Sequence, residues 1–175
     1  VNTYVATHSG SGCNTINGNL SITTNNLDLS GLSFIDSIKG TLTIGNTFGS
    51  NLITVNLTGL TNLKSINGLS INRILNSALP LINLTEITGD IKIRGCPNLQ
   101  SFNFLPPSLF SSSYPYQIWF RDCPSMQFFS SINNLSNVLS LEFENTGIVN
   151  YSPNNLATVG TLSLWDNANL NTVNI

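Results

Sequence analysis

One pattern of apolar residues, a bend and a Cys-Pro pair occurs twice in this chain. It reads Ile91-Lys92-Ile93-Arg94-Gly95-Cys96-Pro97 and, 27 residues later, Ile118-Trp119-Phe120-Arg121-Asp122-Cys123-Pro124. In each copy two apolar residues are separated by one residue of another kind, which is typical of a strand that points every second side chain into a core. The two copies therefore predict two equivalent strands, each ending at a corner.

A looser form of the unit, L-x-x-[IV]-x-G-x-L-x-Φ with Φ apolar, runs through the rest of the chain. The inward-pointing pairs begin at seven positions, Leu20, Leu42, Leu69, Ile91, Ile118, Leu141 and Leu162. Successive positions are 22, 27, 22, 27, 23 and 21 residues apart. A strand that returns at this interval, with Gly and Asn at the bends, indicates stacked coils that share one apolar interior.

We therefore expect an all-β fold, a β-solenoid of about seven rungs. Residues 13–175 would form this single domain, and residues 1–12 an extended N-terminal arm and linker. Pro, Gly, Asn and β-branched residues interrupt every candidate helical window, so helix is expected only in short turns. A two-sheet β-sandwich, which also contains many short strands, stays open as the alternative.

Three segments carry a resemblance to a known family. They are Cys13-x-x-Ile16-x-Gly18-x-Leu20-x-Ile22, Leu63-x-x-Ile66-Asn67-Gly68-Leu69 and Leu84-Thr85-Glu86-Ile87-Thr88-Gly89-Asp90-Ile91-Lys92-Ile93. This pattern resembles the receptor L domain of insulin- and EGF-type receptors and of fungal cell-wall surface proteins. The resemblance implies a right-handed, leucine-rich-repeat-like β-helix that lies outside the cell and binds proteins or glycans or organises a wall.

The composition excludes several classes of protein. Charged residues make up 8% of the chain, against roughly 25% in ordinary globular domains, so neutral polar side chains, 27 Asn among them, must keep it soluble. A net charge of -2 gives no electrostatic footprint for nucleic acid, and no apolar run is long enough to span a membrane. A start at Val1 fits a secreted chain whose signal peptide has been removed.

We expect no enzymatic activity, no cofactor and no metal site. The single histidine, His8, lies in a Gly/Ser-flanked leader, far from any nucleophile arrangement, and the three cysteines have no metal-binding spacing. Glu142 and Glu144 are the one carboxylate pair of interest. They lie two residues apart on one strand, where nearby arginines favour ion pairing over hydrolysis.

The repeat places two of the cysteines in equivalent positions. Cys96 and Cys123 would occupy the same corner of adjacent rungs, about 5 Å apart at Cα, which is within the range of a disulfide. We therefore predict a disulfide between them, with two unbonded thiols in an internal ladder as the alternative. Cys13 stands at an apolar position of the first motif and is expected to be buried or to cap the end, with pairing to a cysteine outside this chain as the alternative.

The chain contains five N-glycosylation sequons. They begin at Asn19, Asn56, Asn83, Asn134 and Asn150. So many are expected by chance in a chain this rich in Asn, but each Asn precedes a core residue or lies in a loop, which predicts an exposed side chain. A eukaryotic secretory pathway would glycosylate several of them. An unglycosylated bacterial surface repeat is the alternative.

Residues that alternate with the inward pairs form columns on the outer face of the sheet. The last four rungs carry both tryptophans and five charged residues, which gives the candidate partner-binding set Lys92, Arg94, Trp119, Arg121, Glu142, Glu144 and Trp165. Exposed aromatic residues beside arginines are typical of interaction hot spots. In the alternative interpretation the same groups only bind one another, Arg121 with Glu144 and Trp119 with Lys92.

Two functions follow from these patterns. The first is an extracellular, cell-surface or wall-associated recognition or adhesion domain that binds a protein or a glycan. The second is a subunit of an extracellular filament, because the last rung, which includes Leu162 and Val173, carries no polar cap and an uncapped solenoid edge promotes polymerisation. In that case the strand-like residues Thr3–Thr7 of the arm would add to a neighbouring sheet.

Overall fold

The computed structural model describes residues 12–46, 51–79, 81, 83–101, 117–127, 132, 135–153 and 155–175. Its elements, in chain order, are β1 (Thr15–Ile16), β2 (Leu20–Ile22), η1 (Ser30–Leu32), β3 (Ser37–Gly45), η2 (Thr58–Leu60), β4 (Ser65–Asn72), β5 (Glu86–Ile87), β6 (Ile91–Arg94), β7 (Gln117–Cys123), β8 (Asn137–Thr146), β9 (Asn150–Tyr151), β10 (Thr158–Trp165) and β11 (Thr172–Val173). The helical elements η1 and η2 are single 3₁₀ turns. Over the described residues no helix could cross a membrane.

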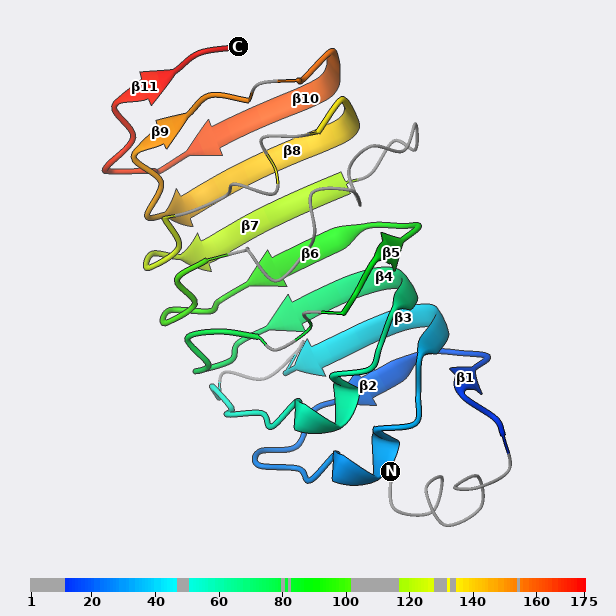
Figure 1. The fold of residues 1–175 in the computed structure, drawn as a ribbon. Helices are drawn as coiled ribbons and strands as arrows, with labels where there is room; N and C mark the ends of the chain where they lie inside the picture. Colours follow the sequence, from blue (N-terminus) through cyan, green and yellow to red (C-terminus); the bar gives the residue numbers. More distant parts are fainter. Residues whose placement is uncertain are drawn as a thin grey trace.

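The fold is a β-solenoid, as the repeat predicts. Its main sheet is parallel, and β2, β3, β4, β6, β7, β8 and β10 lie side by side up the molecule (Figure 1). The seven expected inward pairs are in register from one end to the other, so that Leu20 pairs with Leu42 and Leu141 with Leu162. Seven stacked strands are joined by about six turns of the coil, and the sandwich alternative is wrong.

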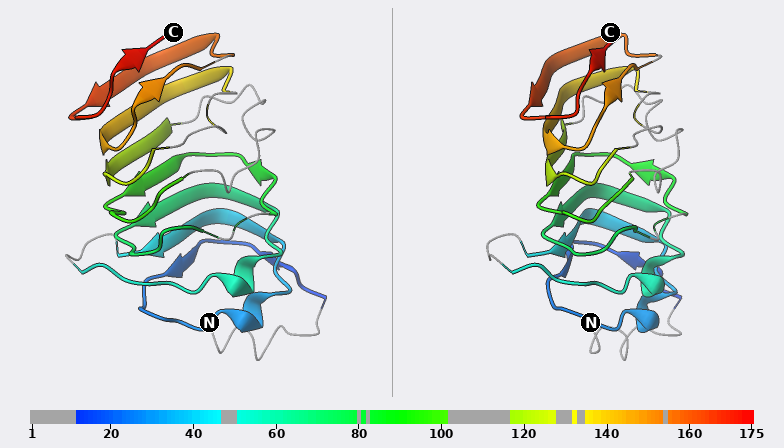
Figure 2. Two further views of the ribbon diagram at one scale, coloured as in Figure 1. Left: turned by 60° about the vertical axis from the view of Figure 1, so that its left-hand side comes forward. Right: turned by 90° about the vertical axis from the view of Figure 1, so that its left-hand side faces the viewer.

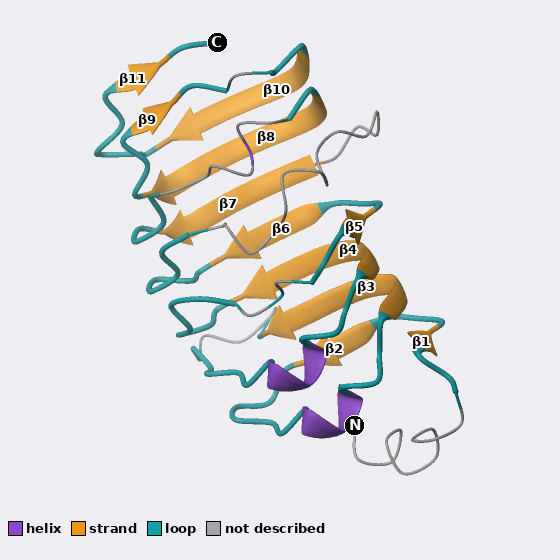
Figure 3. Cartoon of the chain, in the orientation of Figure 1, coloured by secondary structure: helices purple, strands orange, loops and turns teal. Residues whose placement is uncertain are grey.

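The rest of each coil returns behind the main sheet. Figure 2 shows the short elements opposite the sheet, with η1 and η2 in the first coils and the parallel pair β9 and β11 in the last. Most of the regular structure is strand, drawn in orange in Figure 3. Among the described residues, η1 and η2 are the only helical elements of more than one residue. The first and the last described coils therefore lie at opposite ends of the stack (Figure 1).

A continuous apolar column fills the space between the sheet and the returning segments. In the middle coils it is fully buried, and Phe120 of β7 stacks on Phe143 of β8 with ring centroids 5.4 Å apart. Tyr151 lies against Phe143 from the opposite side of the coil, at 5.3 Å. The inward residues of β10, Leu162 and Leu164, are only half-buried. The interior therefore thins toward the last coil.

A left-handed residue turns the chain at the end of most main strands. Gly45 has a φ of 91°, and Asp122 and Asp166, which lie one register position further along their own coils, have φ values of 54° and 52°. At Gly45 a side chain is sterically excluded, because a Cβ there would lie 1.7 Å from the carbonyl oxygen of Asn72 in the next coil. The corners thus bring the backbones of adjacent coils into direct contact.

Asparagine side chains complete the hydrogen bonding where the backbone bends away from the ladder. Asn76 accepts from the N–H of Val55 at 3.0 Å and donates to its carbonyl at 2.8 Å. Asn167 accepts from the Thr146 N–H at 2.9 Å and donates to the Phe143 carbonyl at 2.8 Å. The abundance of Asn therefore has a structural role, since each amide replaces a missing backbone partner in the neighbouring coil.

The cysteine predictions need correction. Cys96 and Cys123 do lie at equivalent buried corners, but both are free thiols and no disulfide joins them. Each thiol donates to a carbonyl two residues earlier in its own coil, Cys96 to Arg94 at 3.3 Å and Cys123 to Arg121 at 3.2 Å. Cys13 is exposed rather than buried, because the first coil has no further described coil to cover it.

Candidate binding surface on the outer face of the sheet

The predicted columns are present on the outer face of the main sheet. Lys92, Trp119 and Glu142 lie in register on β6, β7 and β8, and Ser163 of β10 continues their column. The second column contains Arg94, Arg121, Glu144 and Trp165. Neighbouring parallel strands are about 4.8 Å apart, so these side chains contact one another directly. All seven candidate residues therefore share one surface.

Trp119 is held between two cations. Lys92 Nζ lies 4.5 Å and Arg121 Cζ 4.7 Å from the centroid of its ring. The indole Nε1 is buried and makes no hydrogen bond within the described residues. The predicted contact between Trp119 and Lys92 is confirmed, and both cations occupy sites that a ligand would need.

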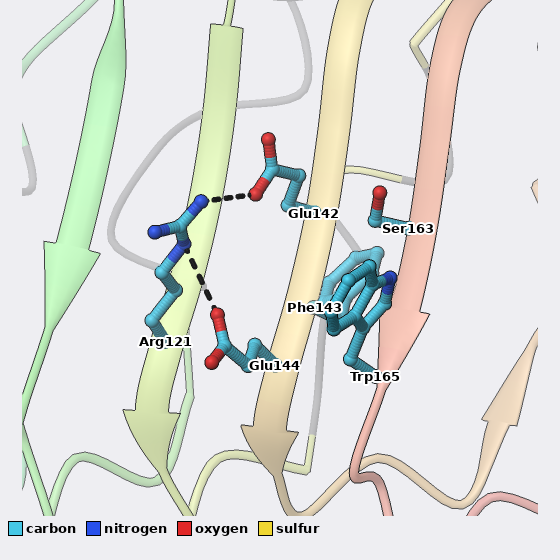
Figure 4. Close-up of a pocket in the computed structure, with 6 residues that line it drawn as sticks. All are labelled: Arg121, Glu142, Phe143, Glu144, Ser163 and Trp165. Carbon is cyan, nitrogen blue, oxygen red and sulfur yellow. Dashed lines mark hydrogen bonds and ion pairs between the residues drawn. The ribbon is translucent and has the colours of Figure 1, made fainter.

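Arg121 joins two carboxylates of the next strand. Its Nη2 donates to Glu142 Oε2 at 2.5 Å, and its Nε lies 3.3 Å from Glu144 Oε2 (Figure 4). Glu142 also accepts from the hydroxyl of Ser140 at 3.2 Å. The predicted pair with Glu144 is confirmed, and the shorter contact with Glu142 was not anticipated. Arg121 thus bridges the two carboxylates, through a hydrogen bond to Glu142 and an ion pair with Glu144 in which its Nε makes no hydrogen bond to any described residue.

Two aspartates also belong to this surface, and the sequence patterns did not predict them. Asp90 binds Lys92 at 2.9 Å, and Asp122 lies 3.7 Å from Arg94. Asp90 could have been predicted from the sequence, because it stands directly before β6 and two residues before Lys92. Asp122 occupies a left-handed corner, where its carboxylate faces Arg94 of the preceding coil and accepts a hydrogen bond from Asn145 of the next coil at 3.2 Å. Most of the charged side chains therefore neutralise one another, as the alternative interpretation expected.

Trp165 is the exception on this face. It is 66% exposed, and within the described part of the chain no cation lies over its ring. Beside it the surface forms a hollow of about 340 Å³. Its lining comprises Arg121, Glu142, Phe143, Glu144, Ser163 and Trp165 (Figure 4). This volume lies at the lower end of the range for small-ligand sites, and its open side faces solvent.

The charge on the surface changes sign along the stack. All six cationic residues of the chain lie between Lys39 and Arg121, and none follows. The C-terminal coils carry only carboxylates, those of Glu142, Glu144 and Asp166 beyond the Arg121 strand. Because Arg121 neutralises only one charge, the hollow beside Trp165 is negative at neutral pH.

Four of the five sequon asparagines fall within the described residues, and all four are exposed; Asn134 lies outside those residues. Their side-chain amides make different hydrogen bonds. Asn83 donates its Nδ2 to the Thr61 carbonyl at 2.6 Å, and Asn19 accepts from the Thr41 N–H at 2.8 Å. Asn56 accepts from the Thr58 N–H and hydroxyl at 3.1 and 2.8 Å. Asn150 accepts from the hydroxyl of Thr172. The predicted exposure is confirmed for these four.

The fold and this surface define a class of molecule: a parallel β-solenoid whose outer sheet carries a network of ion pairs and one exposed tryptophan. No family model, curated protein or solved structure matches the chain. In the ranges that the structure describes, no three His, Cys, Asp or Glu side chains gather into a metal-binding group. The surface itself must therefore carry the functional argument.

Proposed function

We propose that the chain is a non-catalytic recognition or adhesion domain of an extracellular surface or wall, which binds a protein or glycan partner through the outer face of β8 and β10. One observation carries the proposal, the hollow beside the two-thirds exposed ring of Trp165. Exposed tryptophan flanked by immobilised polar groups is the composition of an interaction hot spot. Glu142 and Glu144 are held by Arg121, so little side-chain entropy is lost when a partner binds.

The location outside the cell rests on weaker support from the sequence. The resemblance to receptor L domains implies a surface protein, and the exposed sequons are compatible with a secretory pathway. The low content of charged residues is also typical of neither a cytosolic enzyme nor a nucleic-acid-binding protein. A surface that is polar yet poor in charge suits contact with neutral polymers or with other surface proteins.

A binding assay tests the proposed function. Beads that carry the chain are offered an array of wall and surface glycans and an array of extracellular proteins, and retention is compared between variants. The double variant Trp165→Ala/Glu144→Ala should lose retention of any partner at least about tenfold, as expected for a hot spot. Leu52→Ala is the matched control, because it truncates another exposed apolar side chain far from β10. Equal retention by all three proteins would contradict the proposal.

We propose assembly into a filament as a second function, in which the half-buried residues of β10 would pack against a second copy. Along this strand Val159, Leu162 and Leu164 are only half-buried, although their register partners on β8 are fully covered. The first coil of a second copy would present matching residues, with Leu20 over Leu162 and Ile22 over Leu164. A head-to-tail contact of this kind propagates without limit.

Electron microscopy distinguishes the two functions. Regular filaments that disappear in the variant Leu162→Asp would support assembly, since a buried carboxylate at the contact opposes pairing. Monodisperse single particles at all concentrations would exclude it. The residues 1–11 that contain the proposed donor strand lie outside the described residues.

A further inference from the structure

The two tryptophans of this protein are a matched pair. Both are on the outer face of the main sheet, and both stand directly beside a glutamate on β8, since Trp119 pairs with Glu142 and Trp165 with Glu144. Trp119 has two cations over its ring. Trp165 has the ring and the carboxylate but, among the described residues, no cation. The comparison shows what the Trp165 site lacks among the described residues: a cation over the indole ring.

We infer that the hollow beside Trp165 binds a cationic side chain, an arginine or a lysine, presented by a protein partner. This inference rests on the proposed recognition function and names the partner's chemistry. The exposed indole face attracts a cation through its quadrupole, and the Glu144 carboxylate, 41% exposed, supplies a hydrogen-bond acceptor and a negative charge next to it.

The electrostatics of the last coils favour the same ligand. Between Arg121 and Ile175 the sequence contains no Lys or Arg, so the coils that adjoin the site supply no cation of their own. Glu142 and Glu144 outnumber the one guanidinium that reaches them. A partner's cation would pair with the carboxylate charge that Arg121 leaves in excess on β8.

A neutral ligand fits the observations less well. A saccharide would stack on Trp165 and hydrogen-bond to Ser163, but it would leave the negative charge of the hollow without a partner. It would also give no role to Glu144, whose carboxylate lines the hollow from the Arg121 side (Figure 4). We therefore argue for the cation and treat the saccharide as an outcome of the test.

The experiment compares two capped pentapeptides that differ in one group. Both read Gly-Ser-X-Ser-Gly, with X either arginine or citrulline, its uncharged isostere. Binding is followed by NMR at the two indole N–H signals, which the variant Trp165→Phe assigns. The arginine peptide should shift the Trp165 signal and leave the Trp119 signal unchanged. Citrulline should weaken binding at least about fivefold, as expected from the loss of a cation–π contact and its ion pair.

Variants and salt locate the contact. Glu144→Gln should weaken the arginine peptide several-fold, and added sodium chloride should weaken it further, because surface charges are screened. Affinities of the variants are measured by isothermal titration calorimetry, because the Trp165 variants lack the indole signal. Trp165→Phe should retain part of the affinity and Trp165→Ala none, while Leu52→Ala should match the unaltered chain. Equal binding of both peptides, no binding of either, or a shift at Trp119 instead would overturn the inference.

The two experiments distinguish a failure of this inference from a failure of the proposed function. If a chito-oligosaccharide or another neutral glycan shifts the Trp165 signal and the arginine peptide does not, the recognition surface stands and the cationic partner is excluded. If the bead assay shows no dependence on Trp165 but the arginine peptide still binds there, the site binds cations and the proposed recognition function fails.

Discussion

The strands β8 and β10 carry the same motif, but they differ in how deeply it is buried. Leu141 on β8 and Leu162 on β10 are register partners of the same residue type, and only Leu141 is fully buried. Leu141 is covered by β7 on one side and β10 on the other, whereas Leu162 has one neighbouring coil in the structure. Burial in this fold is therefore a property of a coil's neighbours more than of its own sequence.

The largest expected contrast concerns thiol reactivity in the two regions. Cys13 in the first coil is exposed and should react with iodoacetamide at once. Cys96 and Cys123 are fully buried, and the adjacent Cys96 thiol and burial raise the pKa of the Cys123 thiol, so both should react only through unfolding. With a typical stability of about 5 kcal/mol, that protection slows labelling by nearly four orders of magnitude.

Peptide mapping by mass spectrometry measures the three labelling rates. Labelling in denaturing guanidinium chloride is the control, since all three thiols should then react at similar rates. Rapid labelling of Cys96 in the native protein would show that the middle coils open, and the comparison would fail. A mass lower by two hydrogens, with both buried cysteines unreactive after denaturation, would show the disulfide that the sequence predicts.

A matched pair of truncations tests the same difference by stability. Leu141→Ala removes a fully buried side chain from between two coils and should cost about 2–5 kcal/mol. Leu162→Ala at the register position of the last coil should cost roughly 1 kcal/mol, because the site is already half-open to water. Denaturant unfolding followed by circular dichroism measures both. Equal costs would mean that β10 is covered in solution, by a second copy among other possibilities.

The strands and their stacking were predictable because the fold repeats one simple rule. An inward pair that recurs at a nearly fixed interval can satisfy its apolar face only by stacking, and stacking fixes the register of every outward residue as well. The pairing of Lys92 with Trp119 and of Arg121 with Glu144 followed from that register alone. The columns of the candidate site were therefore available from the sequence.

Side-chain detail was not available from the same rule. Register fixes Cα positions, but the long, rotatable side chain of Arg121 reaches Glu142 more closely than its register partner. Whether Cys96 and Cys123 form a disulfide depends on side-chain orientation. In the structure both thiols donate to carbonyls of their own coils instead. The exposure of Cys13 depends on what covers the first coil, about which its motif carries no information.

A smaller effect should show how the last coil is held although its core is thin. Asn167 makes hydrogen bonds to the Thr146 N–H, the Thr146 hydroxyl and the Phe143 carbonyl of the preceding coil. Asn167→Ala leaves these groups without that partner and should cost about 1–3 kcal/mol, at least as much as Leu162→Ala. Asn169→Ala, an exposed neighbour, is the control and should change stability by less than about 0.5 kcal/mol. The reverse order in denaturant unfolding would show that apolar contacts, not amides, attach β10.

The smallest effect is a pH dependence near the opposite end of the stack. The N–H of Ser30 donates to Asp28 at 2.9 Å, and this hydrogen bond lowers the pKa of the Asp28 carboxyl below its ordinary value. Asn56 performs the same role for Thr58 one coil further on, without a charge. Because the folded pKa of Asp28 is the lower one, its contribution is complete above the unfolded pKa, near pH 4, and disappears as the pH falls through the folded value.

NMR titration of the Asp28 carboxyl measures this effect directly, and Asp28→Asn should make the first 3₁₀ turn as insensitive to pH as the second. The expected change in stability is slight, because the carboxylate is exposed and water screens it. A pKa at or above the ordinary value for aspartate would mean that η1 frays in solution. In that case the coils at both ends of the solenoid would be less tightly held than the interior coils, and the contrast between β8 and β10 would hold at the first coil too.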